Sequence, residues 1–173
     1  DGINADNGCR WRGPDGKLSA SGERVETSER GGTGSGEEGG RAALATGLPV
    51  VTSFVCNREG RLLSGESLAD AAKEIVRLPV AAISVNCILA DTALTAVETL
   101  RRRSGDRPVA IYANVGWFSP ETGWRNSSST DPAVYARHAA DWVRAGARML
   151  GSCCGTTPEH IAALRDLLDS DGL

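Results

Sequence analysis

Short apolar runs alternate with amphipathic stretches from Arg41 to the end of the chain, at a spacing of roughly 25 to 35 residues. Each apolar run has the length and β-branched content of a strand, and each amphipathic stretch repeats its apolar positions with helical spacing. The pattern predicts strands at 49–56, 80–87, 108–114 and 147–151, and helices at about 67–77, 91–103, 131–145 and from 157 onward. A strand-then-helix order repeated four times predicts an α/β fold built on a parallel sheet.

Polar residues mark where each predicted helix begins. Ser67 and Asp70 have capping-box spacing, although aspartate replaces the usual glutamate or glutamine. Asp91 is the expected cap of the second helix. The remaining two starts pair a capping side chain with a proline in the next position, as Asp131 before Pro132 and Thr157 before Pro158.

A long loop is expected at 115–130, between the third strand and the third helix. It holds Trp117, Phe118 and Trp124 on the side of the sheet where the strands end. These aromatic side chains either close over a ligand or pack beneath the loop, and the pattern leaves both interpretations open.

The first 40 residues differ in composition from the rest of the chain. They contain 11 of the 21 glycines and only seven apolar residues. Such a segment buries too little apolar surface to offset the entropy of ordering it. We therefore expect a flexible, glycine-rich tail over 1–42, least structured at 31–40, followed by one domain of four βα units over 43–173.

Charge and composition exclude some classes of partner. The chain has 19 basic and 22 acidic residues, a net charge of −3, and no basic cluster interleaved with aromatics, so we expect no nucleic acid partner. We find no apolar stretch long enough for a membrane span, and no basic start followed by the apolar core of a secretory signal. This pattern favours a cytoplasmic location. A small-molecule partner is the remaining expectation.

Three of the five cysteines are predicted to meet at one edge of the sheet. Cys153 and Cys154 follow the fourth strand in the run GSCCGTTPEH, and Cys87 ends the second strand. The carboxyl ends of parallel strands share one face, so the three thiols should lie together. A disulfide between adjacent cysteines needs a strained ring, whereas zinc accepts thiolates readily and keeps an open fourth position in catalytic sites. We therefore predict a Zn²⁺ site on these cysteines, able to activate a substrate thiol.

Other interpretations of the polar residues remain open. The cysteine pair is also compatible with buried thiols that fill space, or with a thiol redox protein. Cys56 ends the first strand but is interpreted as a non-ligand, and Cys9 as incidental. His138 and His160 are interpreted as solvated or supporting residues rather than catalytic bases.

Two asparagines lie at predicted strand ends. Asn86 precedes Cys87, and Asn114 ends the third strand. Their amides could orient a substrate carboxylate or amine, or could simply form turns.

The cysteine motifs resemble those of the zinc-dependent homocysteine S-methyltransferases, over about residues 43–168. GSCCGT at 151–156 is similar to the family's GGCCGT, and SVNC at 84–87 is similar to its G-x-N-C. Further similarity lies in TGLPVVTSF, GRLLSGESLADA, VAIYANVGW and TTPEHI. The resemblance implies zinc ligands at Cys87, Cys153 and Cys154, and part of a (β/α)8 barrel.

The resemblance also implies an activity, the synthesis of methionine by methyl transfer to the sulfur of homocysteine. Without the further domains of cobalamin-dependent members, a sulfonium donor is expected, either S-methylmethionine or S-adenosylmethionine. The family has a Glu-Thr pair one helix before the GLP strand, and Glu26 and Thr27 lie near that spacing. Glu26 is therefore a candidate substrate-binding residue, although the glycine-rich segment after it does not predict the intervening helix.

Two features depart from the family. Ser84 and Ser152 replace glycines of the two motifs, and both are small enough for us to expect tolerance. A whole barrel takes about 250 residues, so four βα units correspond to its second half. Open sheet edges favour association, and we expect the chain to self-associate. A catalytically incompetent, zinc-binding remnant is the alternative to an active enzyme.

Overall fold

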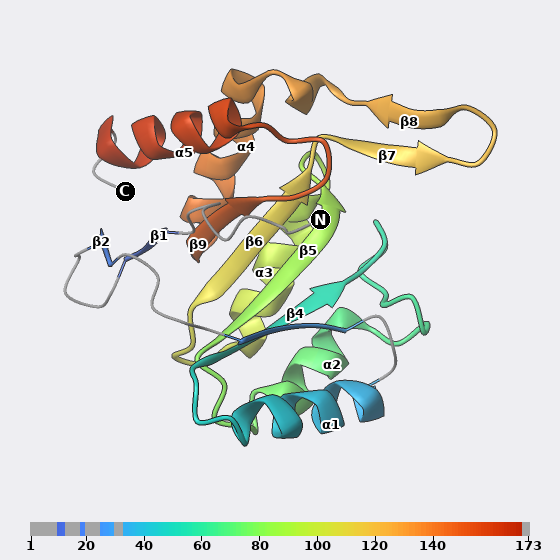
Figure 1. The fold of residues 1–173 in the computed structure, drawn as a ribbon, viewed down its shortest axis with the longest axis vertical. Helices are drawn as coiled ribbons and strands as arrows, with labels where there is room; N and C mark the ends of the chain where they lie inside the picture. Colours follow the sequence, from blue (N-terminus) through green and yellow to red (C-terminus); the bar gives the residue numbers. More distant parts are fainter. Residues whose placement is uncertain (1–9, 13–17, 20–24, 30–32, 171–173) are drawn as a thin grey trace.

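The computed structural model describes residues 10–12, 18–19, 25–29 and 33–170. A seven-stranded sheet in the order β2-β1-β9-β6-β5-β4-β3 forms its centre (Figure 1). Its strands are β1 (Arg10–Arg12), β2 (Leu18–Ser19), β3 (Val25–Glu29), β4 (Val50–Val55), β5 (Ala82–Leu89), β6 (Val109–Asn114) and β9 (Ala147–Ser152). The helices are α1 (Thr33–Leu44), α2 (Leu68–Ile75), α3 (Ala93–Arg103), α4 (Pro132–Arg144) and α5 (Pro158–Ser170).

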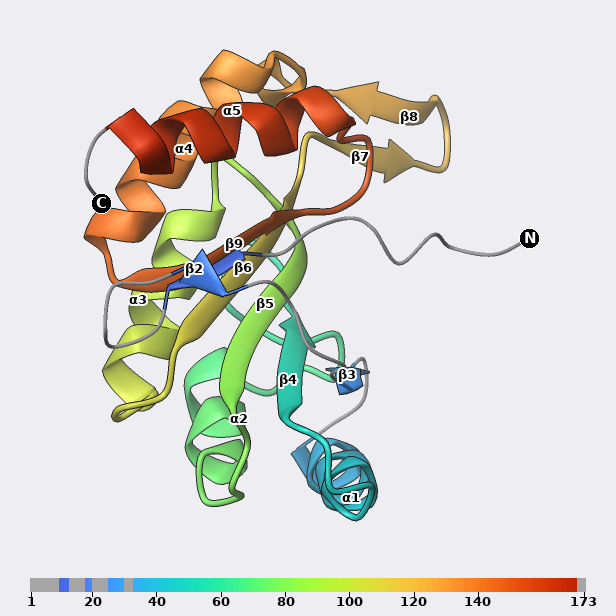
Figure 2. The ribbon, with the colours of Figure 1, turned by 60° about the vertical axis from the view of Figure 1, so that its left-hand side comes forward.

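Five strands of this sheet are parallel and lie side by side in chain order, from β3 through β4, β5 and β6 to β9. One apolar cluster contains side chains from all five helices and from the strands β4, β5, β6 and β9. Figure 2 shows α2, α3 and α4 along one side of the strands. Sequential parallel strands with helices on one face form a segment of a barrel, because a doubly wound sheet reverses its strand order and is covered on both faces.

The opposite face of the sheet carries a smaller apolar cluster of Val51, Ala82, Ala110 and Met149, with Tyr112 packed against it. In a closed barrel this face points to the interior. The predicted α/β fold with a parallel sheet is therefore confirmed, and the barrel it belongs to is present only in part.

The structure contains a βα unit that the sequence pattern did not predict. β3 pairs in parallel with β4, and α1 connects the two strands. The expectation of no regular structure at 31–40 is wrong for the described residues 33–40, which lie in α1. Tertiary packing overrides the low helix propensity of glycine here, since a Cβ at Gly40 would lie only 3.1 Å from Leu78. The division at residue 42 into a tail and a domain stays a prediction.

Most of the predicted helix starts are confirmed. The Ser67 hydroxyl accepts a hydrogen bond from the Asp70 amide, and Asp131 accepts one from Ala133 at the start of α4. The helix α5 begins at Pro158 as predicted. The expected cap at Asp91 is wrong, because the N-cap of α3 is Thr92, one residue later.

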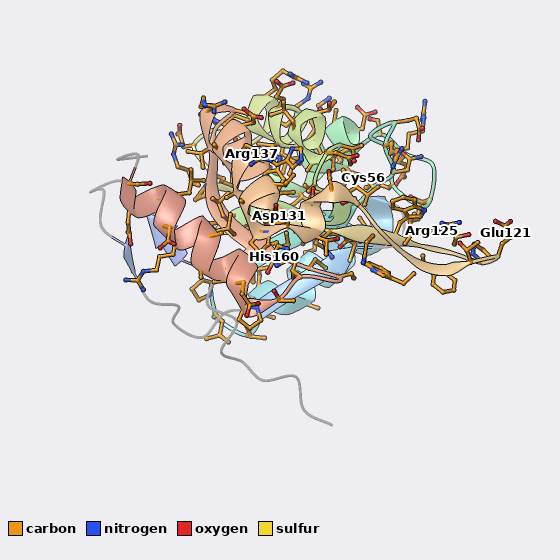
Figure 3. All side chains as sticks on the ribbon, turned by 90° about the horizontal axis from the view of Figure 1, so that it is seen from above. Cys56, Glu121, Arg125, Asp131, Arg137 and His160 are labelled. Carbon is orange, nitrogen blue, oxygen red and sulfur yellow. The ribbon has the colours of Figure 1, made fainter. Side chains whose placement is uncertain are left out.

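The segment expected to be a long loop contains a hairpin. β7 (Gly116–Ser119) pairs antiparallel with β8 (Gly123–Asn126), and the short 3-10 helix η1 (Ser128–Thr130) follows. The hairpin extends beyond the sheet, with Glu121 and Arg125 along it (Figure 3). Each strand of the hairpin has only four residues and begins with a glycine, so the local pattern does not predict it and cross-strand pairing decides the structure.

Among the described helices, none has both the length and the apolar character needed to cross a membrane.

Candidate metal centre

The three cysteines singled out in the sequence lie together. The Sγ atoms of Cys87 and Cys153 are 3.3 Å apart, and those of Cys153 and Cys154 are 3.8 Å apart. All three sulfurs lie within 4.8 Å of one another, and Cys154 is exposed to solvent. The fold therefore brings residues 66 positions apart in the chain into one thiol cluster.

A β-bulge presents Cys87 to this cluster. The pairing of β5 with β6 shifts register between Asn86 and Ile88, so Cys87 is the extra residue of the bulge. Its φ is +56°, the one positive φ of a non-glycine residue in the part of the chain that the structure describes. Holding a non-glycine residue in this left-handed backbone conformation costs about 1 to 3 kcal/mol, and such residues persist where the surrounding structure holds them. The strand was expected to end at Cys87, but β5 continues to Leu89.

A backbone-bonded turn presents the other two thiols directly after β9. The Cys153 amide donates to the Ala113 carbonyl at 3.0 Å, and the Val115 amide donates to the Cys154 carbonyl at 3.2 Å. The Thr156 hydroxyl donates to the Cys153 carbonyl at 2.6 Å. The turn is thus tied both to the end of β6 and to itself.

Gly155 completes this turn and touches the hairpin. Its φ is +79°, and a Cβ there would lie 2.7 Å from the Trp124 ring and 3.0 Å from Val115. Only glycine meets both demands without strain. Trp124, which remains 42% exposed, therefore lies beside the cysteine turn.

The two candidate asparagines contact the cysteines. The Asn86 Nδ2 lies 3.3 Å from the Cys87 sulfur, and its Oδ1 accepts a hydrogen bond from the Ser53 hydroxyl at 2.7 Å. The Asn114 Oδ1 accepts one from the Cys154 amide at 3.1 Å. Both side chains border the thiol cluster, and their predicted contact with substrate stays a prediction.

Glu26 lies in β3, where its Cα pairs with Val51 of β4. One helix, α1, separates it from β4, as the family resemblance expects. Its role in binding substrate stays a prediction.

The buried side chain of Tyr135 connects the ends of two strands. The Tyr135 hydroxyl lies 2.9 Å from the Gly151 carbonyl and 3.1 Å from that of Ala113, so it joins β9 to β6 next to the thiols. The side chain of Tyr135 is fully buried, and burial raises its pKa. Sequence reasoning missed this residue, because nothing in its helical pattern separates it from other core positions.

His160 is a buried supporting residue, since its side chain is only 1% exposed. The Thr157 amide donates to its Nδ1 at 3.1 Å, so Nε2 carries the proton and donates to the Ser129 carbonyl at 3.1 Å. The histidine thus takes the place of the glutamate in a capping box and ties α5 to η1. Figure 3 shows it beside the start of α4 at Asp131. Of the two interpretations left open for His160, solvated or supporting, these contacts fit the supporting one.

The electrostatics of the cluster favour a cation. The Cys87 thiol, the neighbouring thiols and burial together raise the pKa of Cys153 well above its ordinary value. Thiolates this close together repel one another unless a positive charge lies between them. Three sulfurs at about 2.3 Å from a tetrahedral zinc would lie about 3.8 Å apart, close to the spacings found here. The donor set therefore fits a soft metal ion.

Cys56 follows β4 but lies outside this cluster. Burial raises its pKa to about 11, so it stays a neutral thiol at physiological pH. The four described cysteines, 56, 87, 153 and 154, are free thiols, and Cys9 lies outside the described residues.

Comparison with known proteins gives one consistent family. The model of the homocysteine S-methyltransferase family matches residues 35–168. A homocysteine S-methyltransferase of Escherichia coli (strain K12) is 31% identical over 130 residues, which cover 72% of this chain and 41% of that protein. Homocysteine S-methyltransferase 3 of Zea mays is 26% identical over 125 residues, 70% of this chain and 37% of that protein.

Solved structures agree with these relatives. The metallated form of the homocysteine methyltransferase MmuM from Escherichia coli is similar with a TM-score of 0.60 and 27% identity, over 75% of this chain and 40% of that one. Its apo form is similar with a TM-score of 0.63 and 26% identity, over 79% and 46%. The chain therefore spans about two fifths of the length of the curated relatives it matches.

Proposed function

This chain belongs to the homocysteine S-methyltransferase family, and we propose from that premise that it supplies the metal-binding and thiol-activating half of such an enzyme. The reaction is methyl transfer from a sulfonium donor, S-methylmethionine or S-adenosylmethionine, to the sulfur of homocysteine. The single observation that carries the proposal is the cluster of Cys87, Cys153 and Cys154 at the carboxyl ends of neighbouring strands.

These three cysteines would hold Zn²⁺ through their thiolates. A zinc ion bound there would lower the pKa of the homocysteine thiol, so that a thiolate exists near neutral pH. The exposed position of Cys154 supports access of the substrate sulfur from solvent. Asn86, Asn114 and Glu26 are the proposed contacts to substrate.

The proposed transfer is a direct displacement. The sulfur of homocysteine donates an electron pair to the methyl carbon of the donor, and a new C–S bond forms. The bond from that carbon to the donor's sulfonium breaks, and its electron pair neutralises the leaving thioether. The protein's part is to hold the two sulfurs in line with the methyl carbon between them.

Further strands must complete the barrel around this site. β3 has β4 as its one neighbour among the described strands, so the backbone groups on its other side form an open edge. We propose that another segment or a second copy of the chain covers this edge. Light scattering at micromolar concentration tests self-association, and a clean monomer contradicts it.

Metal analysis followed by an activity assay tests the proposed function. We expect one zinc per chain, and methionine formation from homocysteine and S-methylmethionine. Stoichiometric zinc without methionine would support the zinc-binding remnant instead. Absence of zinc together with a thiol count that changes with oxidant would support a redox protein.

A further inference from the structure

We propose that Asn86 is a positioning residue, which Ser53 orients and which donates an N–H···S hydrogen bond to the Cys87 thiolate. This inference rests on the proposed function, because it concerns how one ligand of that metal site is held. It assigns Asn86 a contact within the protein in addition to the proposed contact with substrate.

The sheet register brings the three side chains together. Ser53 of β4 pairs with Ser84 of β5, and Asn86 lies two residues further along β5. Side chains two residues apart share a face, so Ser53 reaches Asn86 as a diagonal neighbour. The Ser53 hydroxyl lies 2.7 Å from the Asn86 Oδ1, and the Asn86 Nδ2 lies 3.3 Å from the Cys87 sulfur.

The chemistry of the two ends fixes the orientation of the amide. A thiolate has no proton and can only accept a hydrogen bond, so the NH2 group of Asn86 must face Cys87 when a metal is bound. Its carbonyl oxygen then faces Ser53, whose hydroxyl donates. Ser53 is only 6% exposed, so water competes little for this hydrogen bond.

Cys87 needs such a contact more than the other two thiols. Its backbone has a strained positive φ within a bulge, whereas Cys153 and Cys154 lie in a turn tied by five hydrogen bonds to their backbone. An N–H···S bond would fix the Cys87 side chain and draw electron density from its sulfur. Outer hydrogen bonds of this kind are typically worth about 10- to 100-fold in metal affinity.

The neighbouring serine offers a matched control. Ser84 is fully buried on the same face of the sheet, and its hydroxyl makes only a long contact of 3.4 Å with the Val85 carbonyl. Substituting Ser84 by alanine removes the same atom as substituting Ser53, one strand away. It leaves Asn86 and the sulfurs untouched.

Titration with Co²⁺ and Zn²⁺ tests the proposal without measuring enzyme activity. For Asn86→Asp and Asn86→Ala we expect affinities about 10- to 100-fold lower than in the unmodified chain, measured by competition with a chelator. The sulfur-to-cobalt charge-transfer band should move to lower energy, because the hydrogen bond that stabilises the sulfur electrons is gone. Ser53→Ala should show a smaller change in the same direction, and Ser84→Ala none.

Circular dichroism of each variant separates loss of fold from loss of the contact, and Ser53→Ala carries the test if the Asn86 variants unfold. Affinities and spectra unchanged in the folded variants would overturn the inference while leaving the metal site intact. Equal losses in Ser53→Ala and Ser84→Ala would also overturn it, as a general effect on the sheet. A lack of metal binding by the unmodified chain would instead refute the metal site itself and the inference with it.

Discussion

The bulge of β5 and the turn after β9 present cysteines to the same cluster by different means. Cys87 reaches it from within a strand, on a backbone with φ of +56°. Cys153 and Cys154 reach it from a turn outside the ladder, where Gly155 adopts the positive φ. The bulge therefore places backbone strain on the cysteine itself, and the turn avoids this strain because its positive φ falls on a glycine.

The difference shows how a parallel sheet can bring cysteines together from strands that end at different distances from the cluster. β9 ends before its cysteines, so a turn is enough to bring them over the end of β6. β5 extends two residues past Cys87. In a regular strand, the alternation of side chains would therefore decide which face of the sheet Cys87 lies on. The extra residue of the bulge re-aims it.

Loss of a ligand should have the largest effect. We expect Cys87→Ser, Cys153→Ser and Cys154→Ser to lose stoichiometric zinc, because each removes one of three thiolates. The measurement is metal content of the purified chain after dialysis. Cys56→Ser is the control and should keep its zinc, since Cys56 lies outside the cluster. Loss of zinc from Cys56→Ser, with zinc kept by the other three variants, would overturn the ligand assignment.

Filling the turn at Gly155 should have the next largest effect. Gly155→Ala adds a Cβ that would lie 2.7 Å from Trp124, on a backbone with φ of +79°. We expect the free energy of unfolding to fall by about 3 kcal/mol, from backbone strain and overpacking together. Chemical denaturation measures it.

Gly105→Ala is the matched control for that substitution. Gly105 also has a positive φ, +59°, but a Cβ there would meet nothing within 4 Å. It should cost about 1 kcal/mol from backbone strain alone. Equal costs at the two positions would show that the contact with Trp124 contributes nothing.

The buried thiol of Cys56, which follows β4, gives a pH test. Burial raises the pKa of Cys56 from 9.0 to about 11, so the folded state disfavours its thiolate. The stability this provides is present in full below pH 9 and is lost as pH rises through 11. We expect the unmodified chain to lose about 2 kcal/mol of unfolding free energy over that window relative to Cys56→Ala. If the unfolding free energies of the two proteins changed with pH in parallel, the raised pKa of Cys56 would be contradicted.

The smallest expected effect compares glycine with alanine at the two cysteine positions in metal-free protein. At Cys87 the positive φ favours glycine, so Cys87→Gly should be more stable than Cys87→Ala by about 1 kcal/mol. Cys153 is not among the described residues with positive φ, so the order should reverse there. Denaturation of the four variants measures both differences. The same order at both positions would remove the distinction between bulge and turn.

The sequence by itself determined the regular part of this protein. Apolar runs and capping residues predict β4, β6, β9 and the starts of α2, α4 and α5, because these signals depend on neighbours in the chain. The meeting of three cysteines was also predictable, since carboxyl ends of parallel strands lie on one face. The family resemblance, confirmed over residues 35–168, rests on the same motifs.

Only the tertiary structure decided the features that depend on partners distant in the chain. The helix α1 forms in a glycine-rich segment through packing against the rest of the fold, and β3 through pairing with β4. The bulge at Cys87 and the Ser53–Asn86 hydrogen bond depend on the register between strands, which local pattern does not specify. The chain thus specifies which residues reach the thiol cluster, and the pairing of its strands specifies how each is held.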